Sequence, residues 1–157
     1  MIDKNNAVFL EMKRIGHEWE ERRAEHQSRK QPIIDTYGWD SQEIKDWYAE
    51  KEANKFPFTA GENKAYRAWA GSISRGQDEI EMNDFLFDTE VTDFSRTLIA
   101  AGVTSFVYSN TSTAVMENLH ALAAEGWTLS GLCTIKRTED HWGGEEEYEV
   151  QGIRFTR

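Results

Sequence analysis

Histidine and carboxylate side chains are the first residues to consider for chemistry, because they serve as general acids, general bases and metal ligands. The four histidines are His17, His26, His120 and His141. His17-Glu18 begins like the zinc-binding pattern H-E-x-x-H, but position 21 is glutamate, so the pattern fails. His17 and Glu21 are one helical turn apart, which favours a solvated pair over a metal site.

Patterns for nucleophiles and phosphate binding are absent. The sequence has no G-x-S-x-G or S-x-x-K, and Gly143-Gly144 is followed by three glutamates that would repel a phosphate. The single cysteine, Cys133, excludes an internal disulfide and is expected to be a small core residue. We therefore expect a protein that is not an enzyme and has no metal or cofactor. An unrecognised active site, in which His120 or His141 meets a carboxylate, is the alternative.

The run from residue 77 to 93 carries seven carboxylates and no basic residue, with Phe85-Leu86-Phe87 between the acids. Carboxylates around exposed apolar anchors suit a basic, nucleic-acid-binding groove on a partner protein. A solvated surface is the alternative. The loop from 139 to 147 repeats the pattern with Trp142 at its tip, unless Trp142 folds back on the sheet. The predicted partner-binding residues are Asp78, Glu79, Glu81, Asp84, Phe85, Phe87, Asp88, Glu90, Asp93 and Trp142.

The net charge of −10, from 18 basic and 28 acidic residues, disfavours direct nucleic-acid binding, because the protein's field repels phosphates. No apolar run approaches the roughly 20 residues that cross a bilayer, and no signal peptide is visible. We expect a cytoplasmic protein that does not contact membranes.

The N-terminal part predicts three helices. The first spans 5–29 and is ended by Gln31-Pro32, and its apolar stripe stops at Trp19, which leaves the last two turns solvated or used by a partner. The second starts with Asp40 as N-cap and Trp39 as a hydrophobic staple residue, and runs to about Lys55. The third spans about 62–73 behind a capping box at Thr59 and Glu62. We expect a helical region over 1–76 and an α+β region over 77–157.

The C-terminal part predicts a helix from about 90 to 101, a strand over 104–109, a helix over 113–125, and strands over 128–136 and 148–156. The helix over 113–125 should be capped by residues 110–113, bury Leu119 and Leu122 with Met116, and end at Gly126 in a Schellman turn. Leu129, Cys133 and Ile135 should face inward, and Gly152 marks an expected β-bulge. The first two strands should be parallel if they are neighbours, and the last two should form a hairpin.

The run Leu119-x-x-Leu122-x-x-x-Gly126-Trp127-x-Leu129 resembles the L-x-x-L-x-x-x-G-W-x-L signature of a small bacterial domain of unknown function. That resemblance covers about the last third of the chain and implies no activity. The whole chain is also similar to uncharacterised proteins of phages and conjugative elements of gut bacteria.

The sequence thus predicts an α+β fold in which N-terminal helices pack on a small C-terminal β-α-β-β sheet unit. The expected function is an acidic, non-enzymatic binding protein of a mobile element. It would inhibit or modulate a basic, nucleic-acid-binding protein partner, with an anti-CRISPR-type inhibitor as the sharpest version. A structural homo-oligomer, such as a homodimer paired through a sheet edge, is the alternative.

Overall fold

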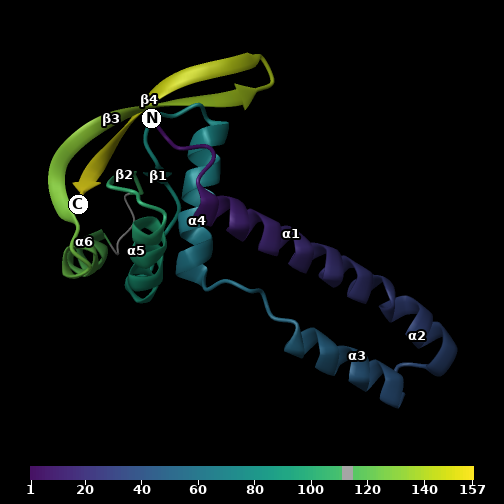
Figure 1. Cartoon of the computed structure of the whole chain (residues 1–157). Helices are drawn as coiled ribbons and strands as arrows, with labels where there is room; N and C mark the ends of the chain where they lie inside the picture. Colours follow the sequence, from purple (N-terminus) through teal and green to yellow (C-terminus); the bar gives the residue numbers. More distant parts are fainter. Residues whose placement is uncertain (111–114) are drawn as a thin grey trace. The chain divides into compact units, whose positions relative to one another are not determined.

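The computed structural model describes residues 1–110 and 115–157, and the side chains of residues 140 and 141 lie outside the description. The chain forms two compact units, Met1–Leu10 with Phe58–Arg157, and Glu11–Pro57 (Figure 1). The predicted α+β fold, with helices followed by a C-terminal sheet, is confirmed. The expected boundary at residue 76 does not coincide with this division.

Residues 11–57 form a helical hairpin from most of α1 (Ala7–Ser28), α2 (Lys30–Tyr37) and α3 (Gln42–Ala53). The first helix ends at Ser28, close to the predicted residue 29, but the sequence did not predict that Pro32 lies in the first turn of a following helix, α2. A proline is tolerated there, since its missing amide would have no partner within the helix. The N-cap of α3 is Ser41 and not Asp40: the Ser41 hydroxyl accepts a hydrogen bond from the Ile44 amide at 3.3 Å. Trp39, the predicted staple residue, is 63% exposed.

The last turns of α1 pack against α3 through His26 and Trp47. The Trp47 indole donates to the His26 carbonyl at 2.8 Å, and the two rings stack with centroids 4.5 Å apart. His26 Nε2 lies 3.0 Å from the Trp47 carbonyl. Most residues of these turns are exposed, as predicted, but His26 is 9% exposed and packs on α3, which the sequence did not predict.

The other unit holds a four-stranded mixed sheet, in the order β1-β2-β4-β3. Its strands are β1 (Glu81–Met82), β2 (Ser105–Tyr108), β3 (Thr128–His141) and β4 (Gly144–Thr156). β1 is parallel to β2, whereas β4 is antiparallel to both β2 and β3. The sequence did not predict β1. The strands predicted over 104–109 and 128–136 correspond to β2 and β3, and they are not neighbours because β4 lies between them.

The core of this unit lies between the sheet and two helices, α5 (Val91–Ala100) and α6 (Val115–Ala124). Phe106 on β2 is its centre, with ring centroids 5.5 Å from Phe94, 4.9 Å from Trp127 and 5.3 Å from Phe155. The Trp127 indole donates to the Ser95 hydroxyl at 2.7 Å, so this large ring is buried without an unsatisfied donor. Another helix of this unit, α4 (Ala60–Ser74), packs against α5 and β1. The predicted capping box at Thr59 and Glu62 is confirmed at its start.

The end of α6 confirms the predicted Schellman turn. Gly126 has φ 90°, its amide donates to the Ala123 carbonyl, and the Trp127 amide donates to the Leu122 carbonyl, both at 3.0 Å. The predicted buried stripe is partly wrong: Met116 is 74% exposed, and Asn118 is buried in its place. The Asn118 amide donates to the Leu86 carbonyl and the Tyr108 hydroxyl, which sequence periodicity does not reveal. Most of the predicted cap, residues 111–113, lies outside the described residues.

The β-bulge lies at Leu129/Gly131 and not at Gly152, so that prediction is wrong. The extra residue reverses the alternation of β3, so Cys133 and Ile135 lie on the opposite face from Leu129. Leu129 is 53% exposed, Cys133 is half-buried and Ile135 is buried. Burial raises the pKa of the Cys133 thiol. Gly152 lies where β4 packs closely against β2, since a Cβ at this position would lie 2.4 Å from Val107 Cγ1 on β2.

Candidate partner-binding surface

Glu81 is the one residue of the predicted set that lies fully inside the protein. Its side chain is 0% exposed and lies among donors from the α4–β1 loop, from the residue that follows β2 and from β3. Gln77 Nε2 donates to Glu81 Oε2 at 2.6 Å and the Ser109 hydroxyl donates to Oε1 at 2.5 Å. Arg137 Nε lies 3.0 and 3.1 Å from the two carboxylate oxygens, and Arg137 Nη2 also donates to Oε1. Glu81 therefore organises the interior and cannot contact a partner.

The Glu81 carboxylate is ionised in this setting. Burial alone would raise its pKa, but the hydrogen bonds from Arg137, Ser109 and Gln77 outweigh burial and hold the pKa below its ordinary value. The same contact with Glu81 raises the pKa of Arg137. Such a multiply donated buried pair is costly to break on one side, because the remaining charge stays buried.

Three more acids of the run have basic partners in the same unit. Arg154 contacts Glu79 at 2.8 Å, Arg67 contacts Asp84 at 3.2 Å and Lys64 contacts Glu90 at 2.5 Å. Asp78 and Asp88 are exposed, Asp93 is half-buried, and the Asp88 side chain accepts from the neighbouring Thr89 amide. The run is thus divided between interior, paired and exposed positions, and it does not form the single acidic face that the sequence suggested.

The structure brings Phe85, Phe87 and Glu90 together around Lys64. The two phenylalanine rings are in edge contact at 4.4 Å, and the Lys64 ammonium lies 5.2 Å from the Phe87 ring. Phe87 remains 53% exposed, whereas Phe85 is half-buried. A basic residue from α4, far away in sequence, therefore neutralises this part of the run.

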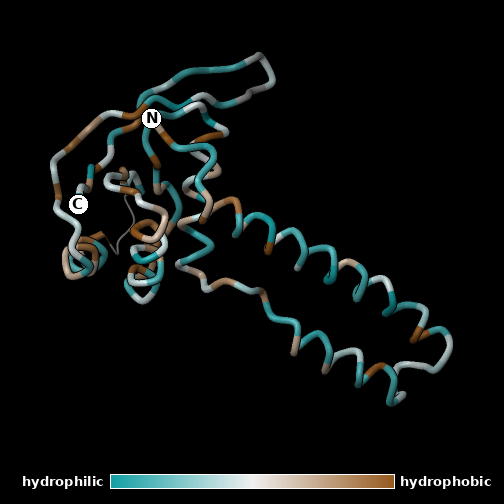
Figure 2. Tube along the Cα trace, in the orientation of Figure 1, coloured by the Kyte–Doolittle hydropathy of each residue, from teal (hydrophilic) through white to brown (hydrophobic). Residues whose placement is uncertain are grey.

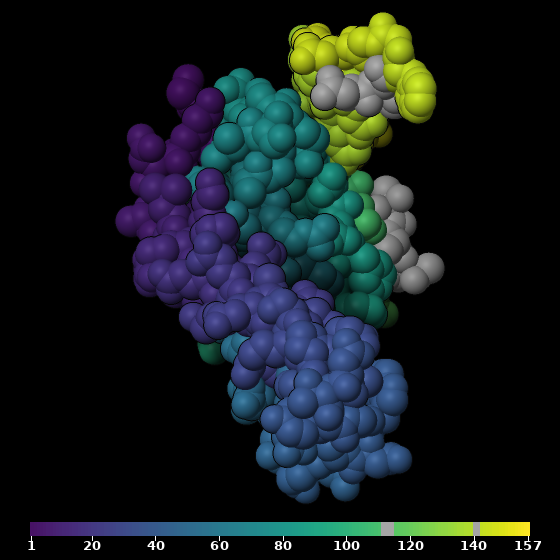
Figure 3. Space-filling view, turned by 90° about the vertical axis from the view of Figure 1, so that its right-hand side faces the viewer, coloured from purple at the N-terminus to yellow at the C-terminus, as the bar shows by residue number. Residues whose placement is uncertain are grey.

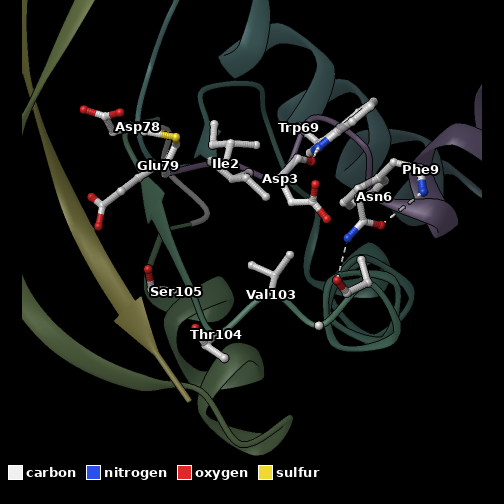
Figure 4. A pocket seen from close by; sticks show the side chains of 14 residues that line it. Ile2, Asp3, Asn6, Phe9, Trp69, Asp78, Glu79, Val103, Thr104 and Ser105 are labelled. Carbon is white, nitrogen blue, oxygen red and sulfur yellow. Dashed lines mark hydrogen bonds between the residues drawn. The ribbon is translucent and has the colours of Figure 1, made fainter.

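Two other members of the predicted set, Asp78 and Glu79, line a pocket of about 270 Å³ (Figure 4). Figure 4 shows their side chains on one side of the pocket, and Asp3 on the other side near Trp69. The Trp69 indole donates to the Asp3 carbonyl at 3.0 Å, which holds the N-terminal segment in place. These acids therefore lie at the edge of a small depression and not on a broad docking face.

The longest acidic surface lies on the β3–β4 hairpin. β2 pairs only with residues 153–156 of β4, whereas β3 and β4 stay paired from Thr128↔Thr156 to His141↔Gly144. The part from Thr134 to Gln151, the acidic hairpin, is therefore a two-stranded arm beyond the sheet, coloured yellow-green to yellow in Figure 1, and its yellow outer part projects at the top of Figure 3. Figure 2 shows mainly hydrophilic residues along it.

Contacts at its base hold the acidic hairpin in position. Ile135 is 8% exposed, the Gln77 amide donates to the Lys136 carbonyl at 3.3 Å, and Arg137 pairs with Glu81. A two-stranded hairpin is only marginally stable alone, so these anchors determine where the arm projects.

The acidic hairpin contains six carboxylates and two basic residues, and one of these, Arg137, is engaged by Glu81. Its exposed carboxylates are those of Glu139, Glu145, Glu146, Glu147 and Glu149. Glu139 lies directly opposite Glu146, and residue 140 lies opposite Glu145. Trp142 at the turn is 110% exposed, so it does not fold back on the sheet. The arm thus carries exposed carboxylates on both strands and an exposed aromatic ring at the tip.

Of the histidines with described side chains, His17 forms the exposed pair that the sequence predicts. His17 and Glu21 form an exposed pair at 3.3 Å, and His120 is exposed on α6. The His141 side chain lies outside the described residues. Within the described part, no three His, Cys, Asp or Glu side chains come close enough to hold a metal ion. No helix in residues 1–110 and 115–157 is both long and apolar enough to cross a bilayer.

Comparison with known proteins places the C-terminal part in a family. Residues 64–157 match the model of the family described as Domain of unknown function (DUF7698). No curated protein matches the chain, and no solved structure matches it either. The expected resemblance of the C-terminal third to a domain of unknown function is confirmed, with a domain that already begins within α4. Because the match covers more than half of the chain, this protein belongs to the family Domain of unknown function (DUF7698).

Proposed function

We propose that this protein is a non-enzymatic binding protein whose acidic hairpin docks on a basic surface of a partner protein. The observation that carries the proposal is the exposure of the Glu145, Glu147 and Glu149 carboxylates along one strand of the hairpin, beside the fully exposed ring of Trp142 at its turn. Residues at alternate positions lie on one face of a strand, so these three carboxylates share a face. A basic partner supplies counter-charges to that face on binding.

Trp142 supplies the apolar contact that charge alone lacks. Tryptophan is enriched among the residues that dominate binding energy, and a ring that is 110% exposed has its whole surface available for burial. The carboxylates accelerate the encounter through long-range attraction, and the ring lowers the dissociation rate. The exposed acids Asp78 and Asp88 add to the field around the unit without forming the contact.

The partner class with matching chemistry is a protein whose basic groove binds nucleic acid. An acidic two-stranded arm occupying that groove excludes the nucleic acid and so inhibits or modulates the partner. In its sharpest form the protein is an inhibitor of the anti-CRISPR type, carried by a mobile element and acting in the cytoplasm.

The test is affinity capture from a cell lysate at low and high salt, with three full-length baits read by mass spectrometry. The baits are the wild type, a hairpin variant (E145K/E146K/E147K) and a matched variant that reverses three exposed acids on α1 (E20K/E21K/E25K). Circular dichroism and thermal melting confirm that each bait is folded. We expect the wild type and the α1 variant to capture the same basic, nucleic-acid-binding protein at low salt, and the hairpin variant to lose it. Equal capture by all three baits would overturn the proposal.

A second candidate function is self-assembly through β3, which is an edge strand of the sheet in the described structure. Leu132 on this edge is 81% exposed and Leu129 is 53% exposed, and an open edge with apolar side chains is a template for strand pairing. Light scattering at two concentrations tests it. A concentration-dependent dimer that Leu132→Lys abolishes supports this function, and a monomer at both concentrations excludes it.

A further inference from the structure

The helical unit contains an aromatic cage with an ammonium group already inside. The Nζ atom of Lys30 lies 5.1 Å from the ring centroid of Trp47, 5.2 Å from Tyr48 and 5.6 Å from Trp39. All three distances fall within the roughly 6 Å over which a cation is attracted to an aromatic face. Three faces around one cation form the arrangement by which proteins recognise quaternary ammonium groups.

The walls of the cage are fixed in advance of any ligand. Trp47 is 3% exposed, stacks on His26, and donates its indole hydrogen to the His26 carbonyl. Tyr48 stands nearly perpendicular to Trp47, with an interplanar angle of 83° and centroids 4.9 Å apart. Two walls thus meet at a right angle on α3, and the position of neither depends on Lys30.

The mouth of the cage is open to solvent. Trp39, which forms the third wall from the α2–α3 connection, is 63% exposed, and Tyr48 is 42% exposed. A cage that served only to stabilise the helical hairpin would not need two of its three rings in water. The exposed rings leave a path by which a ligand can replace the lysine.

Lys30 is a poor match for this cage. A primary ammonium carries three hydrogen-bond donors, and among the described residues Lys30 Nζ has no hydrogen-bond acceptor and no ion-pair partner, so ring faces alone hold it. An N-methylated ammonium keeps the charge and replaces the donors with methyl groups, which aromatic faces contact without an unsatisfied polar atom. The cage therefore suits a methylated ammonium better than its present occupant.

We propose that Trp39, Trp47 and Tyr48 form a binding site for an N-methylated ammonium group, and that Lys30 occupies the site until such a ligand displaces it. The site lies in the unit outside the family match and is separate from the acidic hairpin. Binding involves no covalent step, and the ligand's cationic head takes the position of the lysine ammonium.

The test titrates the full-length protein with tetramethylammonium chloride and follows the tryptophan indole N–H resonances by NMR. Sodium chloride at the same ionic strength is the blank, and ammonium chloride is the comparison cation. In the wild type the tethered Lys30 side chain competes with tetramethylammonium for the cage, at an effective concentration on the order of millimolar. We therefore expect Lys30→Ala to bind tetramethylammonium about tenfold more tightly than the wild type does. Ammonium should bind Lys30→Ala more weakly than tetramethylammonium does.

Two variants in the Lys30→Ala background identify the site. Adding Trp39→Ala removes an exposed wall and should abolish saturable binding, whereas adding Tyr37→Ala removes a ring that is also exposed, at 59%, but outside the cage, and should leave binding unchanged. Thermal melting checks that each variant is folded. The proposal is overturned if Lys30→Ala binds no more tightly than the wild type, if loss of Trp39 has no effect, or if ammonium and tetramethylammonium bind equally.

Discussion

Glu81 and Arg137 are 56 residues apart in the chain, yet they form the ion pair that joins β1 to the base of the acidic hairpin. The Glu81 side chain is 0% exposed and the Arg137 side chain is 16% exposed, so the pair is shielded from solvent. Gln77, Ser109 and Arg75 also donate to the carboxylate, with Arg75 Nη2 3.4 Å from Glu81 Oε2. The pair therefore fixes the point from which β3 and β4 leave the sheet, and so positions the carboxylates that we propose contact a partner.

Removing one member of this pair should be strongly destabilising. We predict that Glu81→Gln lowers the free energy of unfolding by about 3–5 kcal/mol, because the Arg137 charge remains buried without a counter-charge. Glu147→Gln, at an exposed position, should change it by less than about 0.5 kcal/mol. Urea unfolding measures both. Replacing the two residues together, in E81L/R137M, should recover part of the loss and not all of it, because Arg75, whose side chain is 19% exposed, still loses its contact with Glu81. A double variant as unstable as Glu81→Gln would contradict this account of the pair.

The stability of the protein should depend on Glu81 in acid. Hydrogen bonds and the Arg137 charge hold the Glu81 pKa below its ordinary value in the folded state. Its contribution is therefore fully present above the unfolded-state pKa of about 4.3, and is lost as the pH falls through the folded-state pKa. We predict that the gap in unfolding free energy between the wild type and Glu81→Gln is constant near neutral pH and narrows below about pH 4. A gap that does not change with pH would count against an ionised Glu81.

Gly152 should tolerate no side chain. A Cβ at this position lies 2.4 Å from Val107 Cγ1 and 3.1 Å from the Tyr108 carbonyl, so β4 would have to move away from β2. We predict that Gly152→Ala costs about 1–3 kcal/mol in chemical denaturation. Gly143→Ala, where nothing lies within 4 Å, is the control and should be close to neutral. Val107→Ala should make the alanine at 152 less costly, and no such coupling would contradict the steric explanation.

The parts of the fold that local chemistry determines could be predicted from the sequence. The capping box at Thr59 and the Schellman turn at Gly126 depend on residues within a few positions of each other, and both predictions are confirmed. Pro32 shows the limit of local rules, because the same residue can follow one helix or open the next.

The parts that depend on distant partners could not be predicted. β1 has only two residues and forms because β2 lies beside it. The sequence suggests a surface position for Glu81, because its donors Arg137 and Ser109 come from distant parts of the chain. The bases that pair with Glu79 and Glu90 are likewise far away in sequence. Trp142 is the member of the predicted set whose exposure agrees most simply with a contact role.

Trp142 should matter for binding and not for folding. We predict that Trp142→Ala changes the unfolding free energy by less than about 0.5 kcal/mol, because the ring is fully exposed. If Trp142 is the central apolar contact, the same change should weaken binding to the captured partner by about 2 kcal/mol or more, roughly thirtyfold. Tyr37→Ala removes another exposed aromatic ring, in the helical unit and outside the cage; it is the matched control and should leave this affinity unchanged. Equal losses from both substitutions would show that Trp142 has no special role.

The salt dependence of the association rate tests the central claim most directly. The purified captured partner would be mixed with the wild type, the hairpin variant E145K/E146K/E147K and the α1 variant E20K/E21K/E25K at several ionic strengths. The account predicts that association of the wild type and the α1 variant slows steeply as salt increases, and that the hairpin variant associates slowly at every salt concentration. A hairpin variant that associates as fast as the wild type, with the same salt slope, would contradict a docking role for the acidic hairpin.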